Sequence, residues 1–116
     1  MEREARIVGA TIPINTAESN IIDTTWAAAV GLKTPAALEA NTVIGFKVAE
    51  SQDGTFLPLY DEDNALVEAT VILNAARAYA LPDKLFAWPY FKLWTQAAGV
   101  DVNQAAARTF VVTLKS

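Results

Sequence analysis

The chain has no cysteine and no histidine among its 116 residues, and it has three serines, at positions 19, 51 and 116. Without imidazole or thiol groups, the sequence excludes histidine acid–base catalysis, cysteine nucleophiles, zinc sites built on Cys or His, and disulfide frameworks. Gly-rich phosphate-binding loops are also missing. We therefore expect a protein that is not an enzyme and that binds no cofactor and no metal.

Long hydrophobic runs and basic clusters are equally absent. No stretch approaches the roughly 18 apolar residues of a membrane span, and the start Met1-Glu2-Arg3-Glu4 does not resemble a signal peptide. Nine basic residues are scattered against 13 acidic ones, for a net charge of −4 and a pI near 4.6. Nucleic-acid binding needs clustered Lys and Arg. We expect neither a nucleic-acid nor a membrane partner, and synthesis in the cytoplasm.

Apolar residues make up 53% of the chain and charged residues 19%. This composition is richer in apolar residues than that of a typical soluble domain. One interpretation is that part of the apolar surface is covered by a partner. The other is that the many alanines inflate the count, and the composition alone leaves both open.

Alternation of apolar and polar side chains dominates the pattern and predicts strands. In segment 42–49, Ile44, Phe46 and Val48 share one face because successive strand side chains point to opposite sides. Asp53-Gly54 and a second apolar run over 55–60 follow, which together predict a β-hairpin. Pro58 has no N–H to donate, so this second strand is expected at an edge or a bulge.

Further strands are expected over 6–14, 30–33, 65–73, 90–94 and 109–115. Segment 74–81 is ambiguous between helix and extended chain, and 35–40 and 82–86 are expected to form short helical turns. The prediction is an all-β fold, an antiparallel β-sandwich or jelly roll of about seven or eight short strands with one or two helical turns. Residues 21–116 form this domain, and residues 1–20 are an N-terminal arm or its first strand.

Aromatic residues are the main candidates for a binding surface. Tyr90 and Trp94 alternate with Phe91 and Leu93, so one of the two sets points away from the main core. Outward aromatics stack on sugars or anchor a protein interface, unless the turn at 82–87 covers this strand on its outer side. The candidate interface residues are Arg6, Ile7, Val8, Ile12, Trp26, Trp88, Tyr90 and Trp94.

Acidic residues gather in the turns at 53 and 61–64. Asp53, Asp61 and Asp63 supply oxygens of the kind that Ca²⁺ prefers, but Asp and Asn also favour turns by bonding their own backbone. The calcium-loop consensus is missing, which favours a solvated turn.

A glycosidase needs a carboxyl group with a raised pKa, and Glu68, the nearest candidate, falls on the polar face of its strand.

From about residue 21 onward, the order of segments resembles small virion-associated proteins of tailed bacteriophages. The resemblance covers roughly three-quarters of the chain and depends on the order of individually weak motifs. These are Ile22-Asp23, Val30-Gly31-Leu32-Lys33-Thr34-Pro35, Gly45-Phe46-Lys47-Val48, Asp53-Gly54-Thr55-Phe56, Leu59-Tyr60-Asp61, Phe86-Ala87, Tyr90-Phe91-Lys92-Leu93-Trp94 and Val102-Asn103-Gln104-Ala105 to Thr109.

This resemblance implies a head decoration, or cement, protein that binds the outside of a phage capsid and stabilises it across neighbouring subunits. The implied partner is the major capsid protein, the implied state is a homo-oligomer with a trimer favoured, and the implied location is the virion surface. The chain is also similar to discoidin-type carbohydrate-binding domains, which implies as an alternative a module for attachment to the host surface.

Overall fold

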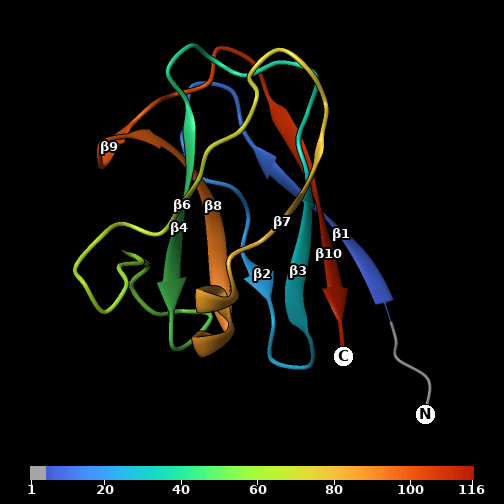
Figure 1. The fold of residues 1–116 in the computed structure, drawn as a ribbon, viewed down its shortest axis with the longest axis vertical. Coiled ribbons are helices and arrows are strands. Elements are labelled where there is room, and N and C mark those ends of the chain that lie inside the picture. Colours follow the sequence, from blue (N-terminus) through green and yellow to red (C-terminus); the bar gives the residue numbers. More distant parts are fainter. Residues whose placement is uncertain (1–4) are drawn as a thin grey trace.

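The computed structural model describes residues 5–116 and consists of two antiparallel β-sheets packed face to face (Figure 1). Sheet A, on the right in Figure 1, has the strand order β1-β10-β3-β7. Sheet B, on the left, has the order β2-β8-β4-β5, with β6 also pairing with β4 and β9 with β8. The fold is an all-β sandwich, which confirms the predicted fold class.

The five longer strands have six to eight residues each and the other five have two or three. The long strands are β1 (Ala5–Ile12), β3 (Ala28–Lys33), β4 (Val43–Ala49), β8 (Tyr90–Ala97) and β10 (Arg108–Lys115). The short ones are β2 (Ile22–Asp23), β5 (Leu57–Pro58), β6 (Glu68–Ala69), β7 (Ala78–Ala80) and β9 (Val100–Asp101). One 3-10 turn, η1 (Asp83–Ala87), precedes β8.

The core lies between the two sheets and follows directly from the alternation. On β4, Ile44, Phe46 and Val48 are buried, and Phe46 meets Phe91 of β8 edge to face with ring centroids 6.2 Å apart. Sheet A contributes Phe110, Val112 and Leu114 of β10, which are all buried. Burial of these apolar side chains is the main stabilising contribution to the sandwich.

The hairpin predicted at Asp53-Gly54 forms with a longer loop than a two-residue turn. β4 and β5 pair antiparallel, with Lys47 opposite Pro58 and Val48 opposite Leu57, so residues 50–56 connect them. Gly54 does not have a positive φ; its N–H donates to the Ser51 carbonyl at 3.1 Å. Positive φ occurs at Asn15, Asn41, Asn64, Ala98 and Gly99 instead.

Most of the other elements follow the expected pattern, and the differences are in segments 35–40 and 65–73. The ambiguous segment 74–81 contains the extended strand β7, and the turn expected over 82–86 is η1. Segment 35–40 contains no helical turn. Of the long run at 65–73, only Glu68–Ala69 is paired in a sheet.

Residues 5–12 form a full strand of the sandwich and not an arm outside it. β1 pairs with β10 over eight residue pairs, from Ala5 opposite Lys115 to Ile12 opposite Arg108. Ala10 and Ile12 are completely buried in the core. The part of the 1–20 segment before residue 5 lies outside the described residues. Within the described range 5–116, no helix is both long and apolar enough to cross a membrane.

Candidate functional site

The outer face of sheet A is uncovered by any other part of the described chain. By the alternation of β1, β10, β3 and β7, this face is formed by the odd-numbered residues of β1 and β10 together with residues of β3 and β7 that pair with them. All of them are exposed or half-buried. They are Ala5, Ile7, Gly9, Thr11, Thr109, Val111, Thr113, Lys115, Ala28, Gly31, Lys33, Ala78 and Ala80.

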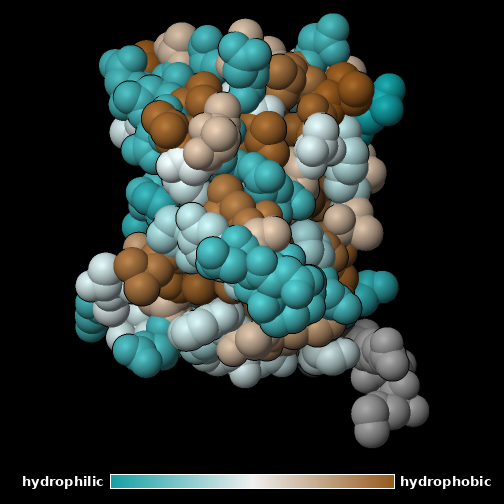
Figure 2. Space-filling view, turned by 60° about the vertical axis from the view of Figure 1, so that its left-hand side comes forward, coloured by the Kyte–Doolittle hydropathy of each residue, from teal (hydrophilic) through white to brown (hydrophobic). Residues whose placement is uncertain are grey.

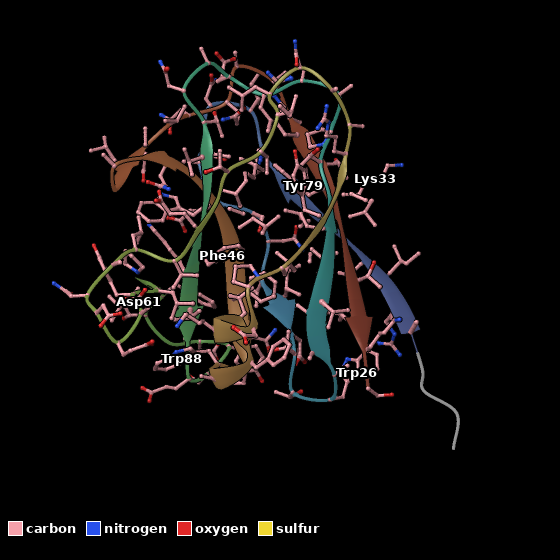
Figure 3. The ribbon with its side chains drawn as sticks, in the orientation of Figure 1. Trp26, Lys33, Phe46, Asp61, Tyr79 and Trp88 are labelled. Atoms are coloured by element: carbon pink, nitrogen blue, oxygen red, sulfur yellow. The ribbon has the colours of Figure 1, made fainter. Side chains whose placement is uncertain are left out.

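The charges of sheet A all have one sign. Its four strands contain Arg6, Lys33, Arg108 and Lys115 and no Asp or Glu, although the whole chain has a net charge of −4. Arg6 stacks over the ring of Trp26 at 4.6 Å, and Arg108 lies 3.5 Å from a Glu39 carboxylate oxygen. Lys33 and Lys115 remain on the outer face, and Lys33 projects away from the other sheet in Figure 3. Apart from the two lysines, the side chains of this face are small or β-branched, and the face is weakly cationic.

Asn20 covers part of the free edge of β1. Its carboxamide accepts a hydrogen bond from the Thr11 N–H at 2.8 Å and donates one to the Gly9 carbonyl at 3.3 Å. Alternate residues of a strand direct their backbone groups to the same edge, so Ile7 shares this edge with Gly9 and Thr11. Since β1 is the last strand of sheet A, its N-terminal half is an open edge that suits the addition of a strand.

Over its two long strands, β4 and β8, the outer face of sheet B is closed by side chains of the same chain. Trp94 is 3% exposed and Gln96 is completely buried, although both point away from the inter-sheet core. The Trp94 indole N–H donates to Asp101 at 2.7 Å, and the Gln96 amide donates to Glu68 at 2.6 Å. Figure 2, which brings the left-hand side of Figure 1 forward, shows hydrophilic and hydrophobic residues interspersed in small patches.

An ionic cluster completes the cover of sheet B. Glu18 lies 2.6 Å from Lys47 and 3.5 Å from Lys92, which are opposite each other on β4 and β8. The Lys47 ammonium also lies over the Trp94 ring at 4.8 Å, and that of Lys92 lies over Phe56 at 4.7 Å. Cation–π contacts and ion pairs of this kind satisfy the charges locally. This face offers few unpaired groups to a partner.

The structure separates the predicted interface residues into different places. Ile12 is completely buried and Val8 packs against the core cluster, so neither contributes to the outer face of β1. Trp94 points outward as alternation predicts, but it is 3% exposed, because Lys47 lies over its ring and Asp101 accepts from its indole N–H. The cover comes from these side chains and not from the turn at 82–87, whose Leu85 joins the core cluster.

The remaining predicted residues lie at the surface but do not form one patch. Ile7 is 71% exposed on the outer face of sheet A. Arg6 and the half-buried Trp26 stack on each other, and Trp26 lines a cavity of about 390 Å³ with Thr24, Phe86 and Lys115 among its walls. Trp88 and Trp26 lie on different sides at the same end of the sandwich (Figure 3). Tyr90 is half-buried at the start of β8.

A second cavity, of about 290 Å³, lies where β4 ends and β5 begins. Its walls include Glu50, Thr55, Tyr60 and Trp88. Tyr60 is not among the interface residues that the sequence predicts, and no pattern in the sequence places it beside Trp88. The exposed Leu57, on the far side of the same loop, completes this end of the cavity.

The carboxylates of Asp23 and Asp61 accept hydrogen bonds within turns of the chain. Hydrogen bonds from Thr25 hold the pKa of Asp23 below its usual range, and the Ala65 N–H does the same for the pKa of Asp61. Asp61 also accepts from the Asp63 N–H at 2.9 Å, which is an Asx turn. Such carboxylates stay ionised and cannot serve as a general acid. Residues 5–116 contain no group of three or more acidic side chains that could hold a metal.

Comparisons with protein-family models, with curated proteins and with solved structures find no match for this chain.

Proposed function

We propose that this chain is a structural, non-catalytic protein that attaches to other protein subunits through the outer face of sheet A. The observation that carries the proposal is the contrast between this uncovered face and the closed outer face of sheet B. A sheet face that no other described element covers, and that exposes a large apolar side chain such as Ile7, is a candidate interaction surface.

Charge defines the chemistry of the partner. The outer face of sheet A carries two lysines and no carboxylate, whereas the rest of the chain is acidic. A complementary surface has an apolar centre bordered by Asp or Glu side chains. The acidic remainder of the chain repels such a surface, so charge favours a single orientation of docking.

The resemblance in segment order gives the proposal a specific form. In this form the partner is the major capsid protein of a tailed phage, and the chain decorates the outside of the capsid across neighbouring subunits. Copies of the chain associate as a closed homo-oligomer, with a trimer favoured, and the open half of the β1 edge offers a site for strand addition between copies. Such a protein stabilises the assembled shell because it binds the shell and not the free subunits.

Co-sedimentation tests this form of the proposal. The purified chain is mixed with capsids assembled from the major capsid protein of the same phage, and pelleting is measured against chain concentration. We expect saturable binding with a fixed ratio of chain to capsid subunit, and a trimer in sedimentation velocity of the free chain. A chain that stays in the supernatant at every concentration contradicts the proposal.

The alternative, a carbohydrate-binding module for host-surface attachment, has a narrower basis. The three tryptophans lie apart, because Trp94 is buried and Trp26 and Trp88 line different cavities. One observation favours a smaller sugar site: the exposed side chains of Tyr60 and Trp88 line the same cavity.

A further inference from the structure

The cavity beside Trp88 combines exposed aromatic rings with an apolar wall. It is about 290 Å³ in volume and lies between the end of β4, the 50–56 loop, β5 and the residue that follows η1. Tyr60 is 51% exposed and Trp88 37% exposed, although both line a concave site. Aromatic rings that present an apolar face and a polar tip in this way suit ligands that are themselves amphipathic.

The polar groups of this cavity have no partners within the described chain. Among residues 5–116, no hydrogen bond or ion pair involves the side chains of Glu50, Thr55, Tyr60 or Trp88. The contrast with Trp94 is direct, because the indole N–H of that residue is bonded to Asp101 at 2.7 Å. The Glu50 carboxylate can therefore accept hydrogen bonds from a ligand. The hydroxyls of Thr55 and Tyr60 and the indole N–H of Trp88 can donate to it.

Charge and size restrict what the cavity can hold. Glu50 is the charged residue of the lining, and the nearest lysines along the neighbouring elements are already paired: Lys47 and Lys92 with Glu18, and Lys84 with Glu62. An anionic ligand would thus meet a carboxylate and no free cation. At about 290 Å³ the cavity lies just below the usual range of ligand cavities, which starts at about 300 Å³, so it suits only a small ligand.

We propose that this cavity binds one neutral pyranose unit of a glycan. The ring C–H face of the sugar packs on Trp88 and Tyr60, and its hydroxyl groups pair with Glu50 and Thr55. The site does not depend on sheet A: it belongs to the β4–β5 side of the sandwich, so a chain docked through sheet A leaves the cavity free for a second ligand.

Titration of the whole chain with single sugars tests the proposal by ¹H–¹⁵N NMR. The probes are the methyl glycosides of glucose, galactose, mannose and N-acetylglucosamine, with sialic acid as the charged comparison. We expect at least one neutral glycoside to bind with a Kd on the order of 1 mM, and to shift the Trp88 indole signal. We expect sialic acid to bind at least about tenfold more weakly.

Matched variants separate a stacking site from a general surface effect. Trp88→Ala is expected to weaken binding by about tenfold or more, and Glu50→Gln and Tyr60→Phe by smaller factors. Phe86→Ala is the control, because Phe86 is 56% exposed in η1 and lines the other cavity. It should leave the Kd unchanged.

Three outcomes would overturn the proposal. One is the absence of any shift at the cavity residues with about 50 mM of each neutral glycoside, well above the expected Kd. Another is equal binding by Trp88→Ala and the unaltered chain, with the fold of the variant verified by its NMR spectrum. The third is tighter binding of sialic acid, or of an apolar peptide, than of every neutral glycoside.

Discussion

The outer faces of the two sheets differ in what covers them. On sheet B, Trp94 and Gln96 point outward and are buried. Lys47 lies over the Trp94 ring, Asp101 accepts from the Trp94 indole N–H, and Glu68 accepts from the Gln96 amide. On sheet A, Ile7, Val111 and Thr113 occupy the same kind of position, and within residues 5–116 Ile7 is exposed and the other two are half-buried. The chain therefore covers much of one outer face with its own side chains and leaves the other exposed or half-buried.

The difference originates in side-chain size and in the course of the loops. Sheet B places a Trp and a long amide on its outer face, and segments from before β2 and after β9 form backbone hydrogen bonds with the edge of β8. Sheet A places Gly, Ala and Thr on its outer face, with a hydrogen bond between the Thr11 and Thr109 hydroxyls at 3.1 Å. Small side chains such as these lose little side-chain entropy when they approach another surface.

The largest expected effect is on binding to the capsid. It is tested by the same substitution at two almost equally exposed residues, one on each sheet. Ile7 on β1 is 71% exposed and Val100 on β9 is 68% exposed. We expect Ile7→Asp to weaken binding to capsids by more than about thirtyfold, or about 2 kcal/mol, because it places a carboxylate in the apolar docking face. Co-sedimentation at several chain concentrations measures the effect.

Val100→Asp is the matched control for this substitution. It makes the same change in charge at a β-branched strand residue of nearly equal exposure, and it should leave the capsid affinity unchanged. Both variants should lose about 1 kcal/mol of stability or less. A loss of binding that is equal in the two variants would mean that the uncovered face of sheet A has no special role.

Two glycines test how tightly each outer face is packed. A Cβ atom added at Gly45 on β4 would lie 2.9 Å from Trp94 Cε3 and 3.1 Å from Gln96 Cγ, whereas one added at Gly9 on β1 meets nothing within 4 Å. We expect Gly45→Ala to lower the free energy of unfolding by about 1–3 kcal/mol. We expect Gly9→Ala to leave it unchanged or raise it by up to about 1 kcal/mol. Urea denaturation of both variants provides the comparison, and similar values for both would refute it.

Removal of one charge tests the ionic cluster on sheet B. Glu18→Gln breaks the contacts with Lys47 and Lys92, and we expect it to lower the free energy of unfolding by less than about 1 kcal/mol, since the three side chains are only partly buried. The loss should shrink as salt is added. Lys33→Gln on sheet A is the control, because Lys33 has no ion-pair partner among residues 5–116, and it should not change stability. A salt-independent loss for Glu18→Gln would contradict the ionic explanation.

The smallest expected effect concerns acid, and it belongs to the half of the molecule that carries sheet B. The pKa of Asp61 is held below its ordinary value of 3.8 by the backbone N–H of Ala65. A carboxyl group whose pKa is lowered in the folded state stabilises the fold when the pH is above the pKa of the unfolded state. This contribution disappears as the pH falls through the folded-state pKa. We expect Asp61→Asn to flatten the decline of the thermal midpoint below about pH 4. An unchanged decline would show that this turn does not contribute.

Alternation was sufficient to predict the sandwich and the sides of its strands. It assigned Ile44, Phe46 and Val48 to the core, and it placed Trp94 on the opposite face from Leu93. It could not predict what lies on top of a face. Trp94 is covered by Lys47 and Glu18, which are distant in sequence, so its burial depends on how the loops return.

The candidate surfaces were harder to find in the sequence for the same reason. The basic residues appear scattered along the chain, and only the order β1-β10-β3-β7 reveals that every charge in the strands of sheet A is positive. The cavity beside Trp88 likewise joins Tyr60 to a residue far along the chain. Pairing between distant segments creates both surfaces, and a period of two carries no information about it.

The orientation of the chain on a capsid is the most direct test of the central claim. Cryo-electron microscopy of capsids saturated with the purified chain can resolve which sheet meets the shell. We predict that the outer face of sheet A, with Ile7, Val111 and Lys33, contacts the capsid subunits and that Trp88 remains exposed to solvent. Density in which the outer face of sheet B contacts the shell, or capsids without any added density, would contradict this account.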